Sequence, residues 1–150
     1  RFCDNNFQTI IMSCGTSTYD EIVESVSYIK NSNLFLMHCV SVYPGEYKKA
    51  NLPKMKELKN ICDNVGLSDH IQGVESSKIA IGEGACIIEK HFTIDRDLPG
   101  RDNKFAILPG DLKILSDFIK FRDLMLEDHG LGFNEKEKDT RKNYTGRFDG

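Results

Sequence analysis

The chain has 150 residues, of which 39% are hydrophobic and 29% are charged. This length predicts one domain with a sizeable core, and this composition excludes disorder, collagen-like repeats and small disulfide-dense folds. Twenty basic residues against 23 acidic ones give a net charge of −3, so bulk charge offers no reason to expect nucleic acid or an anionic membrane as a partner.

Four short apolar runs alternate with helical patterns along the chain. Each run is too short for a helix and is followed by polar residues, which is typical of a parallel strand with both faces buried. The predicted strands are 9–12, 34–40, 65–67 and 85–88. The predicted helices are 16–29, 51–58, 74–81 and 109–127. The first of them has two possible capping boxes at its start. On the last helix, the predicted buried side consists of Leu112, Leu115, Phe118 and Ile119.

The spacing of the predicted strands, ~20 to 30 residues, matches right-handed βαβ crossovers. The predicted fold class is therefore α/β, with a parallel sheet of about four strands and four helices. We place the compact domain at 1–130. Residues 131–150 contain a charged run at 135–142 and are predicted to form a linker or tail.

The sequence also indicates the compartment. No apolar stretch approaches the ~20 residues that cross a bilayer, and the first residues lack the charged and apolar regions of a secretory signal. The five cysteines never fall as C-x-x-C, which argues against a disulfide framework or a thiolate zinc site. We expect a cytoplasmic protein with reduced cysteines that does not enter a membrane.

Two architectures fit four such units: a small doubly wound sheet, or half of an eight-stranded barrel. Neither a dinucleotide-binding G-x-G-x-x-G nor a P-loop follows the first predicted strand. Instead, polar residues follow every strand, and a barrel would gather them on one face. In chain order these are Ser13, then His38, Ser41 and Tyr43, then Ser68, Asp69 and His70, then Glu89, Lys90 and His91.

His70 and His91 form the main candidate site. They lie just past two consecutive parallel strands, ~4.8 Å apart, so both imidazoles could reach one divalent cation in a Lewis-acid role. The alternative is that each is an ordinary hydrogen-bonded histidine, which is also the interpretation favoured for His38. Either Glu89 or Lys90 must point to the barrel interior, and a Schiff-base lyase or aldolase would need Lys90 there.

Five strings stand in order along the chain: 11–16 (IMSCGT), 38–44 (HCVSVYP), 65–70 (VGLSDH), 88–96 (IEKHFTIDR) and 98–102 (LPGRD). Together they resemble the second half of the barrel of the sialic acid synthase family, which comprises N-acetylneuraminate synthases and their relatives for legionaminic acid, pseudaminic acid and spore-coat sugars. The resemblance covers about residues 8–128.

The resemblance implies a TIM barrel that condenses phosphoenolpyruvate with an N-acetylated sugar aldehyde, N-acetylmannosamine or a related sugar. It implies that His70 and His91 bind a catalytic Mn²⁺ or Mg²⁺. The other implied site residues are Ser13 and Ser68, which would hold phosphoenolpyruvate, Tyr43, which would line its pocket, and Glu89 and Asp102, which would face the sugar. Ser41 falls where some members carry Asn and is expected to bind the substrate through a hydrogen bond. With the two histidines, Glu89 completes the predicted catalytic set.

Nothing in the chain corresponds to the first four barrel strands of the family. We therefore interpret it as the second half of a barrel and expect the isolated chain to be inactive and, because its sheet edges are open, to form homo-oligomers. The alternative is a non-catalytic half-barrel that binds a metal or a sugar phosphate, or that serves as an assembly unit.

Overall fold

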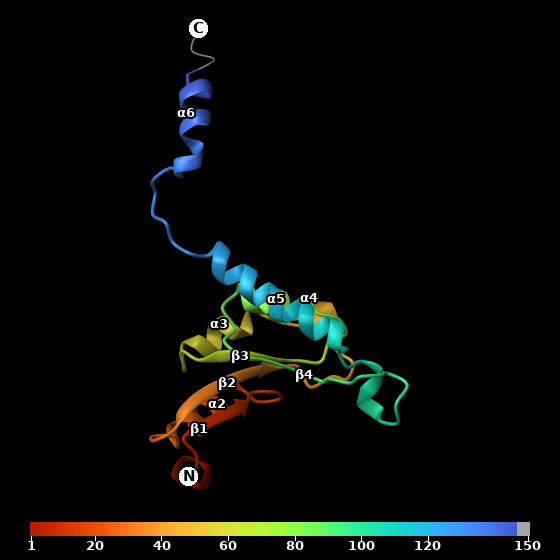
Figure 1. The fold of residues 1–150 in the computed structure, drawn as a ribbon. Coiled ribbons are helices and arrows are strands. Elements are labelled where there is room, and N and C mark those ends of the chain that lie inside the picture. Colours follow the sequence, from red (N-terminus) through yellow and green to blue (C-terminus); the bar gives the residue numbers. More distant parts are fainter. Residues whose placement is uncertain (147–150) are drawn as a thin grey trace.

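The computed structural model describes residues 1–146, and at its centre is a four-stranded parallel sheet (Figure 1). The strands lie side by side in the order of the sequence, and each neighbouring pair is parallel. They are β1 (Thr9–Ser13), β2 (Asn33–Cys39), β3 (Val65–Asp69) and β4 (Ile88–Lys90). The predicted α/β class with four parallel strands is confirmed.

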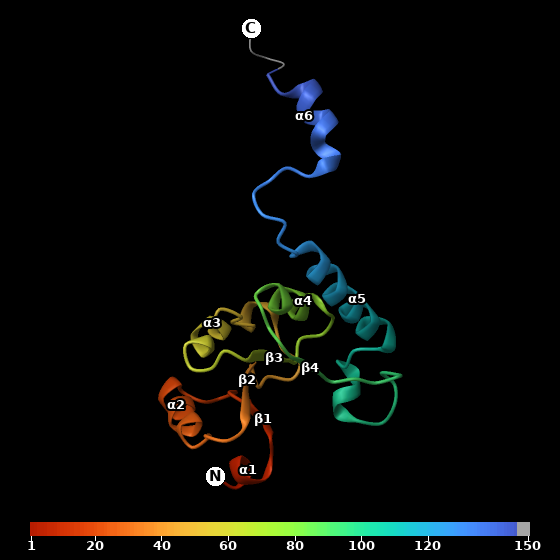
Figure 2. The ribbon, with the colours of Figure 1, turned by 60° about the vertical axis from the view of Figure 1, so that its left-hand side comes forward.

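The sheet is curled, and its main helices lie along the outer side of the curl, so that strands and helices together form half of a barrel wall (Figure 2). The helices are α1 (Phe2–Asn6), α2 (Tyr19–Ser27), α3 (Lys54–Lys59), α4 (Glu75–Gly82), α5 (Pro109–Met125) and α6 (Lys138–Tyr144). Three short 3₁₀ helices are η1 (Tyr47–Lys49), η2 (Arg101–Lys104) and η3 (Glu135–Glu137). Of the two possible capping boxes, the one that forms joins Thr18 and Glu21 at the start of α2.

The carboxyl ends of β3 and β4 extend further than predicted. The predicted third strand stops at Leu67, but pairing continues through Asp69, and β4 begins at Ile88 rather than at 85 and includes Glu89 and Lys90. The prediction is wrong here because it follows apolar runs. Charged residues remain in these strands because each has a partner across the sheet.

The hydrophobic core lies between the outer side of the sheet and the helices. Alternate strand residues such as Leu36 and Leu67 pack against Ile22 of α2 and Met55 and Leu58 of α3. A second cluster joins α4 to α5 through Val74, Ile81, Ile107 and Leu115. The sequence period of the helices therefore places their apolar sides correctly over the sheet.

The inner side of the curled sheet is open at β1. Thr9, Ile11 and Ser13 are exposed, and Ile11 has 54% of its surface accessible. The prediction that this strand is buried on both faces is wrong, because among the described residues no element packs against the inner side of β1.

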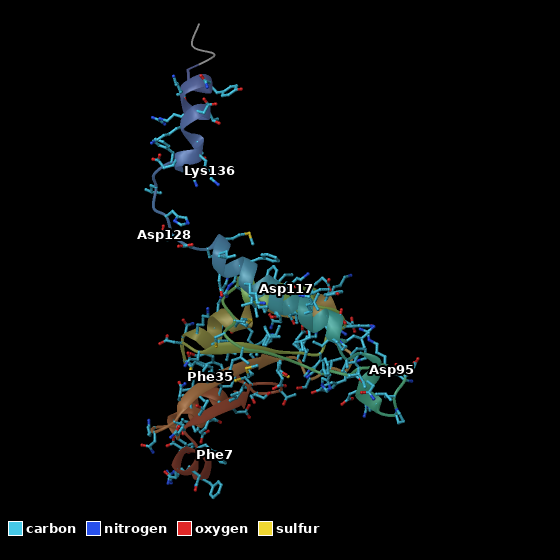
Figure 3. All side chains as sticks on the ribbon, viewed as in Figure 1. Phe7, Phe35, Asp95, Asp117, Asp128 and Lys136 are labelled. Atoms are coloured by element: carbon cyan, nitrogen blue, oxygen red, sulfur yellow. The ribbon has the colours of Figure 1, made fainter. Side chains whose placement is uncertain are left out.

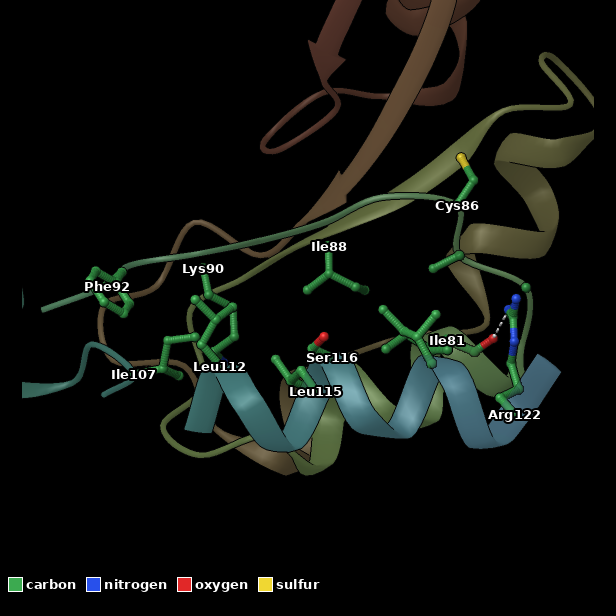
Figure 4. Close-up of a pocket in the computed structure, with 13 residues that line it drawn as sticks. Ile81, Cys86, Ile88, Lys90, Phe92, Ile107, Leu112, Leu115, Ser116 and Arg122 are labelled. Carbon is green, nitrogen blue, oxygen red and sulfur yellow. Dashed lines mark hydrogen bonds between the residues drawn. The ribbon is translucent and has the colours of Figure 1, made fainter. Parts of the chain in front are cut away.

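A groove of about 680 Å³ runs between β4 and α5 on the outer side of the sheet (Figure 4). Ile88, Ile107 and Leu115 contribute to its apolar lining. Leu112 and Ile119 also line it and are 49% and 40% exposed, so the prediction that they are buried is wrong. They stay accessible because β4 is an edge strand whose far side has no neighbour within residues 1–146.

The two ends of the described chain differ. At the amino end, α1 was not predicted, and its Asp4 accepts hydrogen bonds from the backbone N–H groups of Lys30, Asn31 and Ser32. At the other end, residues 123–146 are all exposed, and the segment from Asp128 to Lys136 leads away from the sheet (Figure 3).

None of the helices found in residues 1–146 combines the length and the apolar character that crossing a bilayer requires.

Candidate functional site

The carboxyl ends of β3 and β4 bring the two predicted histidines together. His70 directly follows β3, His91 directly follows β4, and their ring centroids are 5.4 Å apart in an edge-to-face arrangement. Adjacent parallel strands in register, with Ser68 opposite Glu89, cause this proximity.

His70 is fixed in one orientation. Its Nδ1 lies 3.0 Å from the carbonyl oxygen of Val40, and a carbonyl oxygen can only accept, so Nδ1 carries the proton and donates. In the neutral ring, Nε2 is then the free acceptor. Histidines that ligate metals usually make this kind of bond through their other nitrogen.

His91 has a comparable neighbour. Its Nδ1 lies 3.6 Å from Oδ2 of Asp102, a residue of η2, so the carboxylate stands beside the ring. The ring also lies 5.1 Å from the ring of Phe105, between centroids. Asp102, which the resemblance assigned to the sugar, is thus placed beside one of the two histidines.

Tyr43 forms a wall of the site. It belongs to the loop after β2, precedes the cis peptide bond to Pro44, and contacts His70 with the rings tilted by 43° and their centroids 4.1 Å apart. Its ring is also 6.0 Å from His91 and 6.3 Å from Phe105. Four aromatic rings therefore cluster at this corner, and Phe105 is the one that sequence reasoning missed, because it lies in a loop without a motif.

Ser68 and Glu89 form a separate pair on the inner side of the sheet. The Ser68 hydroxyl donates to Oε1 of Glu89 at 2.8 Å, and the two residues are direct partners in the strand register. Ser68 is buried, whereas Glu89 is exposed. The carboxylate therefore stands at the inner surface with one oxygen already bound.

The two remaining predicted residues, Ser13 and Ser41, lie beside Gly15. The Gly15 N–H donates to Ser13 Oγ at 3.4 Å, and a Cβ at Gly15 would lie 2.6 Å from Ser41 Oγ. Cys39 links this group to the histidines, because its Sγ is 3.7 Å from Ser41 Oγ and 3.9 Å from His70 Nδ1. Cys39 was not among the predicted site residues, although it shares the strand parity of Ser41, which could have indicated it.

Lys90 and His38 lie on the other side of the sheet, away from this surface. The Lys90 ammonium forms a buried ion pair with Asp69 at 2.9 Å, so this amine does not stand at the barrel mouth where a Schiff base would need it. Burial alone would raise the pKa of Asp69, but hydrogen bonds from Ser76, Ser77 and Lys90 outweigh it and hold the pKa below its usual value.

His38 donates from Nε2 to the Ala50 carbonyl at 2.8 Å, and burial lowers its pKa. The interpretation of His38 as a packed, hydrogen-bonded histidine is confirmed.

The donor set of the site has two members. Within residues 1–146, no group of three or more His, Cys, Asp or Glu side chains could hold a metal ion. Two imidazoles that share a cation, with bonds of ~2.1 Å, have ring centroids ~5 Å apart, which fits the 5.4 Å observed here. The residues present therefore fit an open site, with further positions left for water, substrate or another part of a protein.

Comparison with known proteins places the chain in a family. The chain matches the NeuB family over residues 2–129. It is 36% identical over 140 residues to the N,N'-diacetyllegionaminic acid synthase of Campylobacter jejuni, an alignment that covers 89% of this chain and 41% of the relative.

Solved structures of related proteins also resemble this chain. The N-acetylneuraminic acid synthetase of Leptospira borgpetersenii, in complex with citrate, superposes with a TM-score of 0.77 at 34% identity, over 91% of this chain and 50% of that one. SpsE of Bacillus subtilis gives 0.70 at 33% identity, over 79% and 35%. The chain spans about half the length of these relatives or less. It belongs to the NeuB family of sugar-acid synthases, and its four strands form part of the barrel of that family.

Proposed function

We propose that the chain forms the metal-binding half of a synthase that condenses phosphoenolpyruvate with an N-acetylated sugar aldehyde, N-acetylmannosamine or a related sugar, in the cytoplasm. The observation that carries the proposal is the convergence of His70 and His91, with 5.4 Å between their centroids and Nδ1 of His70 bound to a carbonyl. Its relatives include a legionaminic acid synthase and a sialic acid synthetase.

The proposed roles follow from the placement of each side chain. His70 and His91 would hold Mn²⁺ or Mg²⁺, and a bound cation supplies Lewis-acid stabilisation for the oxygen of the aldehyde as a carbon–carbon bond forms. Ser13 and Ser41 offer hydroxyl donors to the phosphate or carboxylate of phosphoenolpyruvate, and Ser68 would do so with its hydroxyl turned away from Glu89.

Two further residues would complete the catalytic and binding set on this side of the sheet. Tyr43 would line the site beside His70, since the centroids of the two rings are 4.1 Å apart. Glu89, exposed on the inner side, is positioned to accept a hydrogen bond or a proton from the sugar.

We also propose that turnover requires four further strand–helix units. The relatives are about twice as long as the matched part, and a barrel of this class closes with eight strands. The groove between β4 and α5 is the apolar seat for the next such unit, whose strand would pair with the free edge of β4. In the isolated chain both sheet edges stay open, which favours homo-oligomers.

Calorimetric titration of Mn²⁺ into the chain tests the metal site. We expect one binding event in the wild type and at least a tenfold weaker affinity in His70→Ala and in His91→Ala. His129→Ala is the matched control, because this histidine lies outside the site and its side chain is 76% exposed. If all four proteins bind alike, the assignment of the site is wrong.

Sedimentation velocity over a hundredfold range of concentration tests the open edges. We expect the weight-average sedimentation coefficient to rise with concentration. A monomer that persists at the highest concentration would contradict the proposed homo-oligomer.

A further inference from the structure

A buried polar cluster lies on the outer side of the sheet, directly behind the two histidines. Oδ2 of Asp69 accepts hydrogen bonds from Ser76 Oγ and Ser77 Oγ of α4, both at 2.6 Å, and from Lys90 Nζ at 2.9 Å. The side chains of Lys90 and Asp69 are only 4% and 2% exposed. Lys90 belongs to the outer wall, where it contributes to the groove in Figure 4.

The positions of these two residues in their strands link them to the site. Successive strand residues point to opposite sides of a sheet. Asp69 stands between Ser68 and His70, and Lys90 stands between Glu89 and His91. Asp69 and Lys90 are partners in the strand register, so the ion pair joins the two strands on the outer side of the sheet. The residues next to them in each strand form the candidate site on the inner side.

Lys90 is bound to the residues on both sides of His70. Its ammonium donates to the Asp69 carboxylate and also to the carbonyl oxygen of Ile71 at 2.6 Å. The other carboxylate oxygen of Asp69 accepts from the N–H of Ile71 at 3.0 Å. The residues before and after His70 are therefore both bound to one side chain of β4, which itself precedes His91.

Stability alone does not account for such a pair. The desolvation of two buried charges cancels much of their attraction, and the best-attested use of buried polar pairs is to fix register. A register slip of two residues, the smallest that keeps the same side chains on each side, would move His91 by ~6.6 Å relative to His70. The two rings would then no longer reach one cation.

We propose that Lys90, through its pair with Asp69, is a positioning residue that fixes the spacing of His70 and His91. This inference rests on the proposed function, in which these two histidines share a metal ion. Lys90 touches neither the ion nor the substrate and acts through the side chain of Asp69 and the backbone carbonyl of Ile71.

The first test is the Mn²⁺ affinity of a variant that removes both charges of the cluster, Lys90→Met/Asp69→Asn. Lys90→Met alone leaves an unpaired buried carboxylate, so it serves only for comparison with the double variant. We expect the double variant to bind Mn²⁺ 10- to 100-fold more weakly, the usual loss when a group behind a metal ligand is removed. In the His91→Ala background the same change is expected to have no further effect.

Leu58→Ala is the control for loss of stability, because Leu58 is a buried core residue of α3 outside the cluster. We expect it to lower the urea midpoint and to leave Mn²⁺ affinity within twofold of the wild type. Equal losses of affinity in Leu58→Ala and in the double variant would overturn the proposal. If circular dichroism shows the double variant to be unfolded, Lys90→Arg decides, with an expected loss of at least threefold; unchanged affinity in Lys90→Arg would then overturn the proposal.

The second test needs no metal. Long-range nitrogen-15 spectra of the imidazoles report which ring nitrogen carries the proton. We expect His70 to be protonated on Nδ1 in the wild type and to show mixed tautomers in Lys90→Met/Asp69→Asn or, if that protein is unfolded, in Lys90→Arg. Identical spectra would overturn the role of Lys90. Altered spectra in a chain whose wild type does not bind Mn²⁺ would instead refute the proposed metal site and leave the role of Lys90 standing.

Discussion

The two sides of the sheet differ in how far other residues of the chain cover them. On the outer side, apolar residues pack under three helices, and the charged pair Asp69–Lys90 has every neighbour it needs. On the inner side, Ile11 is half exposed and Ser13 lies at an open edge. The outer side is therefore packed under α2, α3 and α4 and stays open only at the groove beside β4, whereas the inner side carries the candidate site and, in our proposal, is completed by further strand–helix units.

Catalytic turnover gives the largest expected contrast. The isolated chain, mixed with phosphoenolpyruvate, N-acetylmannosamine and Mn²⁺, is expected to release no phosphate above background. Co-expression with the part of the Campylobacter jejuni relative that this chain does not match supplies the remaining barrel strands and is expected to give measurable phosphate release. Equal turnover with and without that part would contradict the proposal that the inner side is incomplete.

Core substitutions test the contrast at the level of stability. Leu36→Ala removes a completely buried side chain on the outer side and is expected to lower the free energy of unfolding by ~2–5 kcal/mol. Ile11→Ala on the inner side is expected to cost less than ~0.5 kcal/mol, because the side chain is already half exposed. Urea denaturation followed by circular dichroism measures both, and comparable losses would remove the distinction between the two sides.

Two serines give a smaller but sharper contrast. Ser77 is fully buried and donates to the buried carboxylate of Asp69, so Ser77→Ala is expected to cost ~1–3 kcal/mol. Ser68 donates to the exposed Glu89, whose carboxylate can turn to water, so Ser68→Ala is expected to cost ~1 kcal/mol or less. The same urea assay ranks the two variants, and a reversed order would contradict the account.

The stability of the fold at low pH depends on Asp4, a carboxylate that belongs to neither side of the sheet. The backbone N–H of Asn31, followed by those of Lys30 and Ser32, lowers the pKa of Asp4 from 3.8 to about 2. Since the pKa is lower in the folded state, this carboxylate stabilises the fold above about pH 4, and its contribution is lost as the pH falls toward 2. We expect the difference in urea midpoint between wild type and Asp4→Asn to shrink over that interval, and a constant difference would argue against this assignment.

The sequence predicts the sheet well and its edges poorly. Strand order and the meeting of His70 with His91 were predictable, because consecutive parallel strands are neighbours and their carboxyl ends share one edge. The exposure of Leu112 and Ile119 was not, because an amphipathic pattern shows which side of a helix is apolar and not whether another element covers it. In the same way, a criterion based on apolar runs ends β4 before Glu89 and Lys90.

Some of the candidate site was within reach of the sequence and some was not. Strand alternation alone puts Asp69 and Lys90 opposite Ser68, His70, Glu89 and His91, so their outward direction could have been inferred. The contact between them depends on the register of β3 with β4, which no local pattern specifies. The approach of Asp102 and Phe105 to His91 depends on the path of a long loop, which only the folded chain shows.

The most direct test of the central claim is pulsed electron paramagnetic resonance on the Mn²⁺-loaded chain, with histidine labelled by nitrogen-15. The account predicts hyperfine coupling to two imidazole nitrogens in the wild type and to one in His70→Ala or His91→Ala. A spectrum without nitrogen coupling, or one that neither substitution changes, would contradict the claim that these two side chains share one ion.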